Sequence, residues 1–476
     1  MNDSKQIAAL EGLAEAAKAR VHRSRSPQLA SIRVSPGAYL AAASVLTFVA
    51  ALLLRSERDL WALVSLAVAW LLIPVLALAD RIAFDGEFLT RHGPMPFVLQ
   101  LISGRSQQLN ISDFEKVDTN AVRTLRRGGR VRYRYRTQVL GRNTIFAFAS
   151  GGRSYREMVR QLFPVIHEDK IDLRTRELRD YLCEPRALTI EVQNMHLASS
   201  EVLDNANPDL KMVRTRRAAA ERDGVAASAL ELDRAAQFRL LGNRLRIAGR
   251  LREAREAFRR ALNVIPRDAW LIYDFARLLR SQASALGDAR LLSRARAALR
   301  LSAVRGKTDA KLLSLIGESL LECGEPARAQ QIFQRVIDLA PRNFRARVGL
   351  ADVALRNGKL AHVIHQYRDA AQVAGEKALL RYTRREADYY ARLNDDDDYL
   401  AAELRRINWL QVSVRVRQLA ARVTNASILV ALVGPSIDSR IAGVGWSLAS
   451  SSLFAWITSL FLTRYLSDRR PPRQTQ

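Results

Sequence analysis

The sequence of 476 residues contains only two cysteines. Cys183 and Cys323 lie far apart in the chain, so neither a disulfide framework nor a cysteine metal site can be built from them. A reducing compartment is therefore the simpler expectation. The chain also has no Gly-x-x-x-x-Gly-Lys phosphate loop and no Gly-x-Ser-x-Gly nucleophile turn. We predict that the protein is not an enzyme and needs no metal or cofactor.

Acidic residues are scarce. The chain has 75 lysines and arginines against 48 acids, which gives a formal net charge of +27. Residues 121–156 contain no Asp or Glu at all. This balance favours anionic partners, namely nucleic acid, anionic lipid or acidic peptide, and it decides nothing about the fold.

Two glycines, an alanine, a phenylalanine and a proline occur twice with the same spacing in the second half of the chain, 75 residues apart. We call these five positions the landmarks. The next step is shorter, because Gly324 to Gly358 and Phe333 to Tyr367 are both 34 residues. Since 75 is two periods of 34 plus seven residues, one further repeat with a short insertion lies between the two clear copies. The landmarks are Gly242, Gly249, Ala254, Phe258 and Pro266, then Gly317, Gly324, Ala329, Phe333 and Pro341.

The spacing of these landmarks resembles the tetratricopeptide repeat (TPR). Each unit would be two antiparallel helices that pack closely at the small residues, with a phenylalanine between repeats and a proline after the second helix. We expect units at 235–268, 269–309, 310–343 and 344–377 and a closing helix at 378–393, within a repeat domain at 231–410. The alternative is an unrelated helical bundle. The resemblance implies a protein that binds other proteins or peptides.

The resemblance also implies a binding groove on the concave face of the repeats. In TPR proteins that grip a C-terminal carboxylate, basic and asparagine side chains of the inner helices hold the ligand. Two departures argue against a complete clamp, because Asp274 and Leu315 stand where an asparagine and a basic residue are expected. We predict a more general peptide groove lined by Arg239, Asn243, Arg246, Arg277 and Lys311.

Long apolar runs occur near both ends of the chain. Residues 37–54 and 60–79 are each close to the length that spans a bilayer, and we predict a transmembrane hairpin at 37–79. A cleaved signal peptide ending near residue 79 is the competing interpretation. Residues 441–463 form another span, and 419–437 a marginal one that carries Arg422 and Asn425. A re-entrant or interfacial helix is the alternative for 419–437.

The positive charges fix the expected orientation. A basic arm (1–36) precedes the first hairpin, and a basic tail (465–476) follows a second hairpin at 411–464. Both ends and the basic middle then lie on the cytoplasmic side. We expect a multi-pass protein of the bacterial inner membrane with its main soluble part in the cytoplasm.

Residues 80–166 have the pattern of short strands followed by a helix. Strands are expected at 81–84, 88–91, 108–117, 130–137 and 143–148, and a helix at 154–166. With the Asp85-Gly86-Glu87-x-Leu89-x-Arg91 opening, this order resembles bacterial pleckstrin-homology-like (PH-like) domains. Residues 167–230 form a connector with a helix at 174–183 and a strand at 188–192. The expected fold class is mainly α, with a TPR-like α-solenoid, transmembrane helices and a small antiparallel β domain.

One predicted strand carries four alternating arginines, which would share one face. Next to a membrane, the nearest dense anion is the lipid surface. A solvated strand face is the plain alternative, and nucleic acid is a third. The arginines are Arg130, Arg132, Arg134 and Arg136.

Together these patterns predict a membrane-anchored scaffold whose repeats bind protein partners near the bilayer while a basic β domain contacts anionic lipid. The alternative is a membrane-tethered nucleic-acid-binding protein that uses the basic strand. The oligomeric state does not follow from the sequence.

Overall fold

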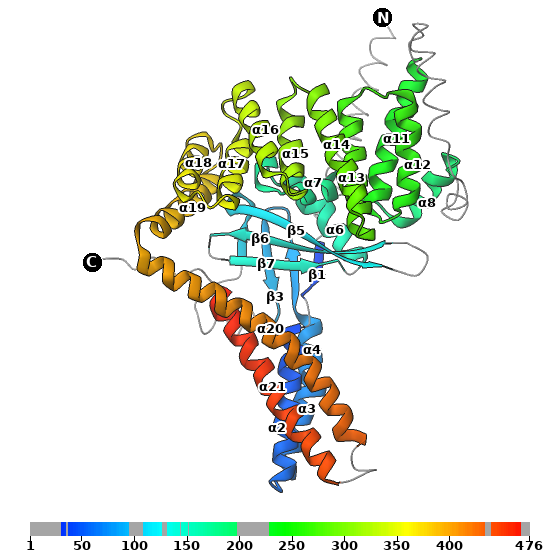
Figure 1. The fold of residues 1–476 in the computed structure, drawn as a ribbon. Helices are drawn as coiled ribbons and strands as arrows, with labels where there is room; N and C mark the ends of the chain where they lie inside the picture. The colour runs from blue at the N-terminus through cyan, green and yellow to red at the C-terminus, as the bar shows by residue number, and fades with distance from the viewer. Residues whose placement is uncertain are drawn as a thin grey trace, which may run out of the picture.

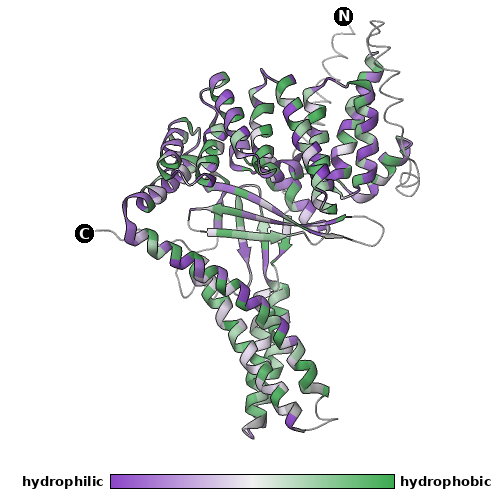
Figure 2. Ribbon diagram, viewed as in Figure 1, coloured by the Kyte–Doolittle hydropathy of each residue, from purple (hydrophilic) through white to green (hydrophobic). Residues whose placement is uncertain are grey.

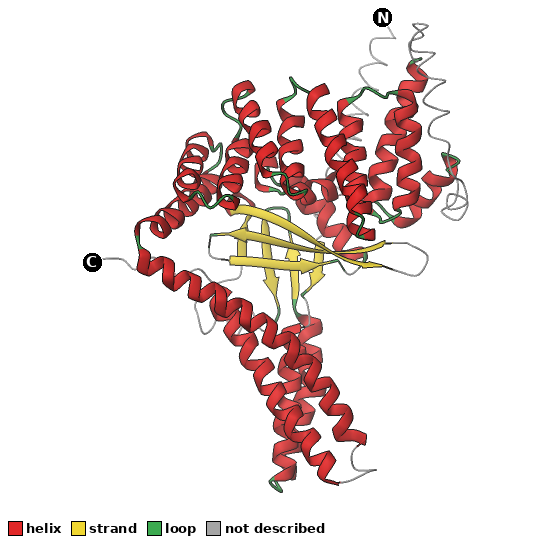
Figure 3. Cartoon of the chain, viewed as in Figure 1, coloured by secondary structure: helices red, strands yellow, loops and turns green. Residues whose placement is uncertain are grey.

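The computed structural model describes residues 30–34, 37–94, 108–125, 131–142, 144–150, 152–197, 228–433 and 439–467. An arc of helix pairs lies above two small β-sheets, and a stalk of long helices extends from the sheets on the other side (Figures 1 and 3). Arg130, most of the basic arm and most of the basic tail lie outside the described residues.

The helix pairs follow one another side by side along the arc (Figure 1). They confirm the predicted TPR-like α-solenoid, and α19 (Lys377–Asp395) closes it. The pairs are α11 (Ala229–Ile247) with α12 (Leu251–Val264), α13 (Ala269–Leu286) with α14 (Ala289–Arg305), α15 (Ala310–Glu322) with α16 (Pro326–Leu339), and α17 (Phe344–Arg356) with α18 (Leu360–Val373).

The repeated landmarks have direct packing roles. A Cβ atom on Gly242 would lie 2.8 Å from the ring of Phe258, and one on Gly317 would lie 2.5 Å from the ring of Phe333. In these two pairs, α11 with α12 and α15 with α16, the helices therefore meet where a glycine of one faces a phenylalanine of the other. The insertion in the second unit lengthens α13, which ends at the left-handed Gly287.

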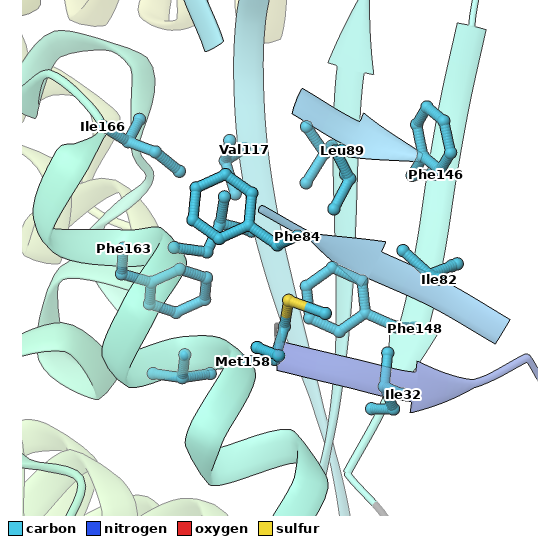
Figure 4. Close-up of a cluster of buried hydrophobic side chains, with 14 of the residues drawn as sticks. Ile32, Ile82, Phe84, Leu89, Val117, Phe146, Phe148, Met158, Phe163 and Ile166 are labelled. Carbon is cyan, nitrogen blue, oxygen red and sulfur yellow. The ribbon is translucent and has the colours of Figure 1, made fainter. Parts of the chain in front are cut away.

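The β-strands form two antiparallel sheets. The first has the order β1 (Ala30–Arg33), β2 (Arg81–Phe84), β3 (Phe88–His92) and β4 (Gln108–Asn110). The second has the order β5 (Phe114–Leu125), β6 (Val131–Gly141) and β7 (Thr144–Ala149). The helix α6 (Arg153–Leu162) packs on them, and Met158 points into a core shared with Phe84 and Phe148 (Figure 4).

Two local predictions differ from the structure. The strand β1 pairs with β2 but precedes the hairpin, in a segment that the sequence analysis assigned to the basic arm. Four residues are too few to show a strand pattern, so only the pairing with β2 reveals β1. The predicted strand at 188–192 is wrong, because α8 (Pro185–Asn194) covers it and buries Leu188 and Val192, one helical turn apart.

The stalk consists of two helical hairpins. The first has α2 (Gly37–Arg55), α3 (Asp59–Ala67), a π-helical turn (Val68–Leu72) and α4 (Ile73–Ala79). The second has α20 (Asp397–Val433), which leads without a break from the repeats into the stalk, and α21 (Ser439–Ser467). Among the described residues, two stretches are long and apolar enough to cross a membrane, Asp59–Ala79 and Gly443–Thr463. Hydrophobic residues dominate much of the stalk (Figure 2).

Candidate protein-interaction site on the inner surface of the repeats

The inner surface of the repeat array, formed by α11, α13, α15 and α17, faces the helix α7 (Leu173–Tyr181) and the sheets (Figure 1). Glu177 of α7 lies between two arginines of the array. Its carboxylate is ion-paired with Arg246 of α11 and lies 2.7 Å from Nη2 of Arg277 of α13. The middle of the predicted peptide groove is thus filled by the chain's own helix.

The ion-paired cluster of Glu177, Arg246 and Arg277 is almost completely buried, with each residue 6% exposed or less. Burial alone would raise the pKa of Glu177, but the two guanidiniums lower it to about 2. The glutamate is therefore ionised at neutral pH. A buried carboxylate between two guanidiniums is the arrangement expected of a bound acidic ligand. Here the chain itself supplies the carboxylate, from Glu177 of α7.

The residues that match the carboxylate-clamp pattern do not form a clamp. Asn243 is fully buried, and its side chain bonds to the Arg239 carbonyl and to Nη2 of Arg246. Arg239 Nε donates to Oδ2 of Asp274 at 2.6 Å. The acid that departed from the clamp pattern therefore neutralises the arginine that would bind a ligand. Lys311 is 64% exposed, with Nζ 3.8 Å from Oε2 of Glu168.

The contact between the array and the β segment continues to both ends of the array. At the first pair, the Tyr135 hydroxyl donates to the Ile247 carbonyl at 2.8 Å. A Cβ on Gly249 would collide with the Val131 carbonyl, so the β6 backbone fits against the turn of this pair only at a glycine.

At the last helix, two arginines of α19 reach acids of the β segment. Arg381 Nη2 lies 2.8 Å from Oδ1 of Asp113, and Arg385 Nη2 lies 2.8 Å from Oε2 of Glu115. From α17, Arg345 donates to the carbonyl of Glu168, which precedes α7, at 3.0 Å. The array and the sheets therefore share an interface that extends from α11 to α19.

Glu177 and the other acids of this interface are not among the site residues predicted from the sequence. A signal was present, because residues 121–156 have no acid whereas residues 113–118 and 168–184 are rich in them. In a strongly basic chain, acids that cluster on either side of an acid-free strand are candidates for ion pairs with basic side chains of the repeats. The helix that carries Glu177 is also marked by Asp172, whose side chain caps its N-terminus.

Open space remains around α7. A cavity of about 320 Å³ next to Tyr181 is lined by Ala236, Arg239 and Leu240 among others. A second, of about 230 Å³, includes Lys311 and Trp270. A third, of about 660 Å³, lies between β5, β6, α7 and α13. Four arginines line it, namely Arg123, Arg174, Arg246 and Arg280.

The basic strand has the predicted alternation. Arg132, Arg134 and Arg136 of β6 are exposed, whereas Val131 and Tyr135 on the other face are buried. The arginines thus lie on the outer face of the second sheet, away from its core.

No protein-family model and no curated protein matches the sequence. The helix pairs, with their glycine–phenylalanine packing, decide the class of the array. Residues 229–395 form a TPR-like α-solenoid.

Several solved TPR structures are similar to parts of it. MamA is 14% identical over 34% of this chain and 85% of that one, with a TM-score of 0.26. YrrB, described as a TPR protein with an unusual peptide-binding site, is 16% identical over 42% of this chain and 98% of that one, with a TM-score of 0.27. A tetratricopeptide repeat protein from Parabacteroides merdae is 14% identical over 60% of this chain and all of that one, with a TM-score of 0.30.

Proposed function

We propose that this TPR-like protein is a scaffold of the bacterial inner membrane. The stalk inserts as two hairpins, both termini stay on the cytoplasmic side, and the repeats with the sheets recruit protein partners at the membrane surface. It has no catalytic role in this proposal.

The observation that carries the proposal is the apolar surface of the stalk. Leu60, Leu63 and Leu71 of the first hairpin are 71%, 65% and 71% exposed, and Phe454 and Phe461 of α21 are 70% and 72% exposed. Soluble monomers rarely expose contiguous apolar surface on this scale. Lipid would cover it, and the 21 residues of Asp59–Ala79 give about 30 Å of helix, the thickness of the hydrocarbon core.

We propose that partners bind in the cavities next to α7 and do not displace α7 from the inner surface of the repeats. The cavity next to Tyr181 is lined by exposed apolar side chains, Ala236 and Leu240. The neighbouring cavity contributes Trp270 and the exposed Lys311. An extended peptide with apolar and acidic side chains fits this chemistry.

The outer face of β6 is proposed to contact anionic lipid. Two antiparallel sheets with a helix packed on them support the PH-like interpretation. The alternation of side chains along β6 puts three arginines on one exposed face. Each would contribute about 1 kcal/mol at an anionic surface, less at high salt. In a vesicle-binding assay with the full-length protein in nanodiscs, Arg134→Gln should weaken attachment to anionic vesicles; competition by RNA instead would favour the nucleic-acid alternative.

The main experiment combines extraction with crosslinking in cells. Carbonate should leave the full-length chain in the membrane, and a photo-reactive residue at Leu240 should capture a protein partner. The same residue at Leu301, exposed on α14, is the control. Release by carbonate would reject the anchor, and equal capture from both positions would reject the site beside α7.

A further inference from the structure

The long helix α20 has one face made of small residues that packs on α21. Ser413, Ala420, Ser427 and Ala431 are all buried there. The Thr424 and Ser452 hydroxyls lie 2.9 Å apart, and those of Ser413 and Thr463 3.0 Å apart. A Cβ on Gly445 would lie 2.6 Å from the Ala431 nitrogen, so the two backbones approach closely. These contacts fix the register of α20 along α21.

The opposite face of α20 is polar and exposed. Arg422 follows Ser413 by nine residues, which at about 100° per residue puts it on the opposite side of α20. Four more polar residues lie on the same side at helical spacing. Among the residues that the structure describes, none of these five side chains makes a hydrogen bond or an ion pair. We call them the polar stripe: Gln411, Arg415, Gln418, Arg422 and Asn425.

The register places the middle of the polar stripe deep along the apolar span. Arg422 is two residues from Thr424, which meets Ser452. Ser452 is nine residues after Gly443 and eleven before Thr463, so it lies about 14 to 16 Å from either end of that span. An arginine side chain at that level is too short to reach headgroups at either surface. By contrast, Arg415 lies near the Thr463 end and can reach them.

The first hairpin shows what a lipid-facing surface of this stalk looks like. Its exposed side chains include Leu63, Leu71, Val75 and Leu78, and residues 60–79 carry no charge. A guanidinium and two amides at the same depth on α20 would be costly in contact with acyl chains. Something other than lipid must cover them when the stalk is inserted.

We propose that the polar stripe binds a transmembrane helix of another protein that carries an Asp or Glu near the bilayer midplane. This rests on the proposed membrane insertion. A carboxylate can form two charge-assisted hydrogen bonds with Arg422, and the amides of Gln418 and Asn425 can satisfy its remaining lone pairs.

A second copy of this chain does not supply this chemistry. In the described helices of the stalk, acids occur only toward the ends, at Asp59, Asp397, Asp398 and Glu403. Two copies that met through the stripe would bring Arg422 close to another arginine, and like charges repel strongly in a low dielectric. Charge complementarity therefore selects an acid-bearing helix of a different protein.

The test uses the full-length protein in native membranes, with a photo-reactive residue at Gln418. The same residue at Val423, exposed on the flank of α20, is the matched control. We expect a protein adduct from Gln418 only, with the crosslinked peptide mapping to an apolar segment that contains an Asp or Glu. Arg422→Leu should reduce the adduct at least about tenfold, while Arg422→Lys, which keeps the charge, should retain most of it.

Lipid adducts alone, a self-adduct, or an adduct insensitive to Arg422→Leu would overturn the proposal. Carbonate extraction of each variant is scored in parallel. If the chain remains in the membrane pellet while the adduct is absent, only the polar-stripe proposal fails. If the chain itself is released, the membrane anchor fails first.

Discussion

Glu177 is the residue on which the interface between α7 and the repeats depends most. It is 3% exposed and is the shared counter-ion of Arg246 and Arg277. We predict that Glu177→Gln lowers the free energy of unfolding by about 3 to 5 kcal/mol, because two buried guanidiniums lose their carboxylate. Urea denaturation of the full-length protein in detergent measures it.

The control for this substitution is Glu157→Gln. Glu157 pairs with Arg153 on the surface of α6, where both side chains are largely exposed. An exposed pair of this kind contributes about 0 to 1 kcal/mol. A loss at Glu177 no larger than that at Glu157 would mean that the buried cluster does not hold α7 in place.

The same carboxylate makes the interface sensitive to acid. The pKa of Glu177 is about 2 in the folded protein and about 4.5 for a free glutamate. Because the folded-state pKa is the lower one, the stabilisation is complete above pH 4.5 and is lost as the pH falls from 4.5 towards 2. The melting temperatures of the wild type and Glu177→Gln should therefore converge over this range. A difference that stays constant down to pH 3 would contradict the assignment.

At the scale of the helix pair, a glycine against a phenylalanine sets the packing distance. We predict that Gly317→Ala destabilises the protein by about 1 to 3 kcal/mol, since the new methyl group would lie 2.5 Å from the Phe333 ring. Gly375→Ala is the matched control, because nothing lies within 4 Å of its Cβ position. Thermal unfolding of both variants decides whether this contact limits the approach of α15 and α16.

Helix α7 also explains why a groove predicted from repeats alone is incomplete. Arg246 and Arg277, two of the predicted groove residues, are both buried and ion-paired with Glu177 of α7. What covers them comes from a segment about 70 to 100 residues earlier in the chain. No pattern within the repeats contains that information, because the occupant is selected by charge complementarity in three dimensions.

At the scale of the whole molecule, the two ends of the array are attached to the sheets by different means. The first pair uses the Tyr135 hydrogen bond and the close fit at Gly249, whereas α19 uses Arg381 and Arg385. We predict that the Arg381→Ala, Arg385→Ala double variant speeds amide hydrogen exchange at the start of β5 and leaves α11 and α12 unchanged. Hydrogen-exchange mass spectrometry measures both regions at once. Faster exchange across all repeats would show that the interface opens as one unit.

The repeats, the apolar runs and the alternating strand could be predicted from the residues alone, because each is a periodicity within a short segment of the chain. Glycine and phenylalanine recur at fixed spacing because α11 with α12 and α15 with α16 have the same packing requirement, and arginines at every second position of β6 must share a face.

Contacts in the folded molecule were needed to learn that β1 joins the sheet from before the hairpin, that Asp274 neutralises Arg239, and that α7 fills the inner surface. They also set the depth of Arg422 along α21. These depend on contacts between segments distant in sequence, where burial and charge pairing select the partner and local spacing does not.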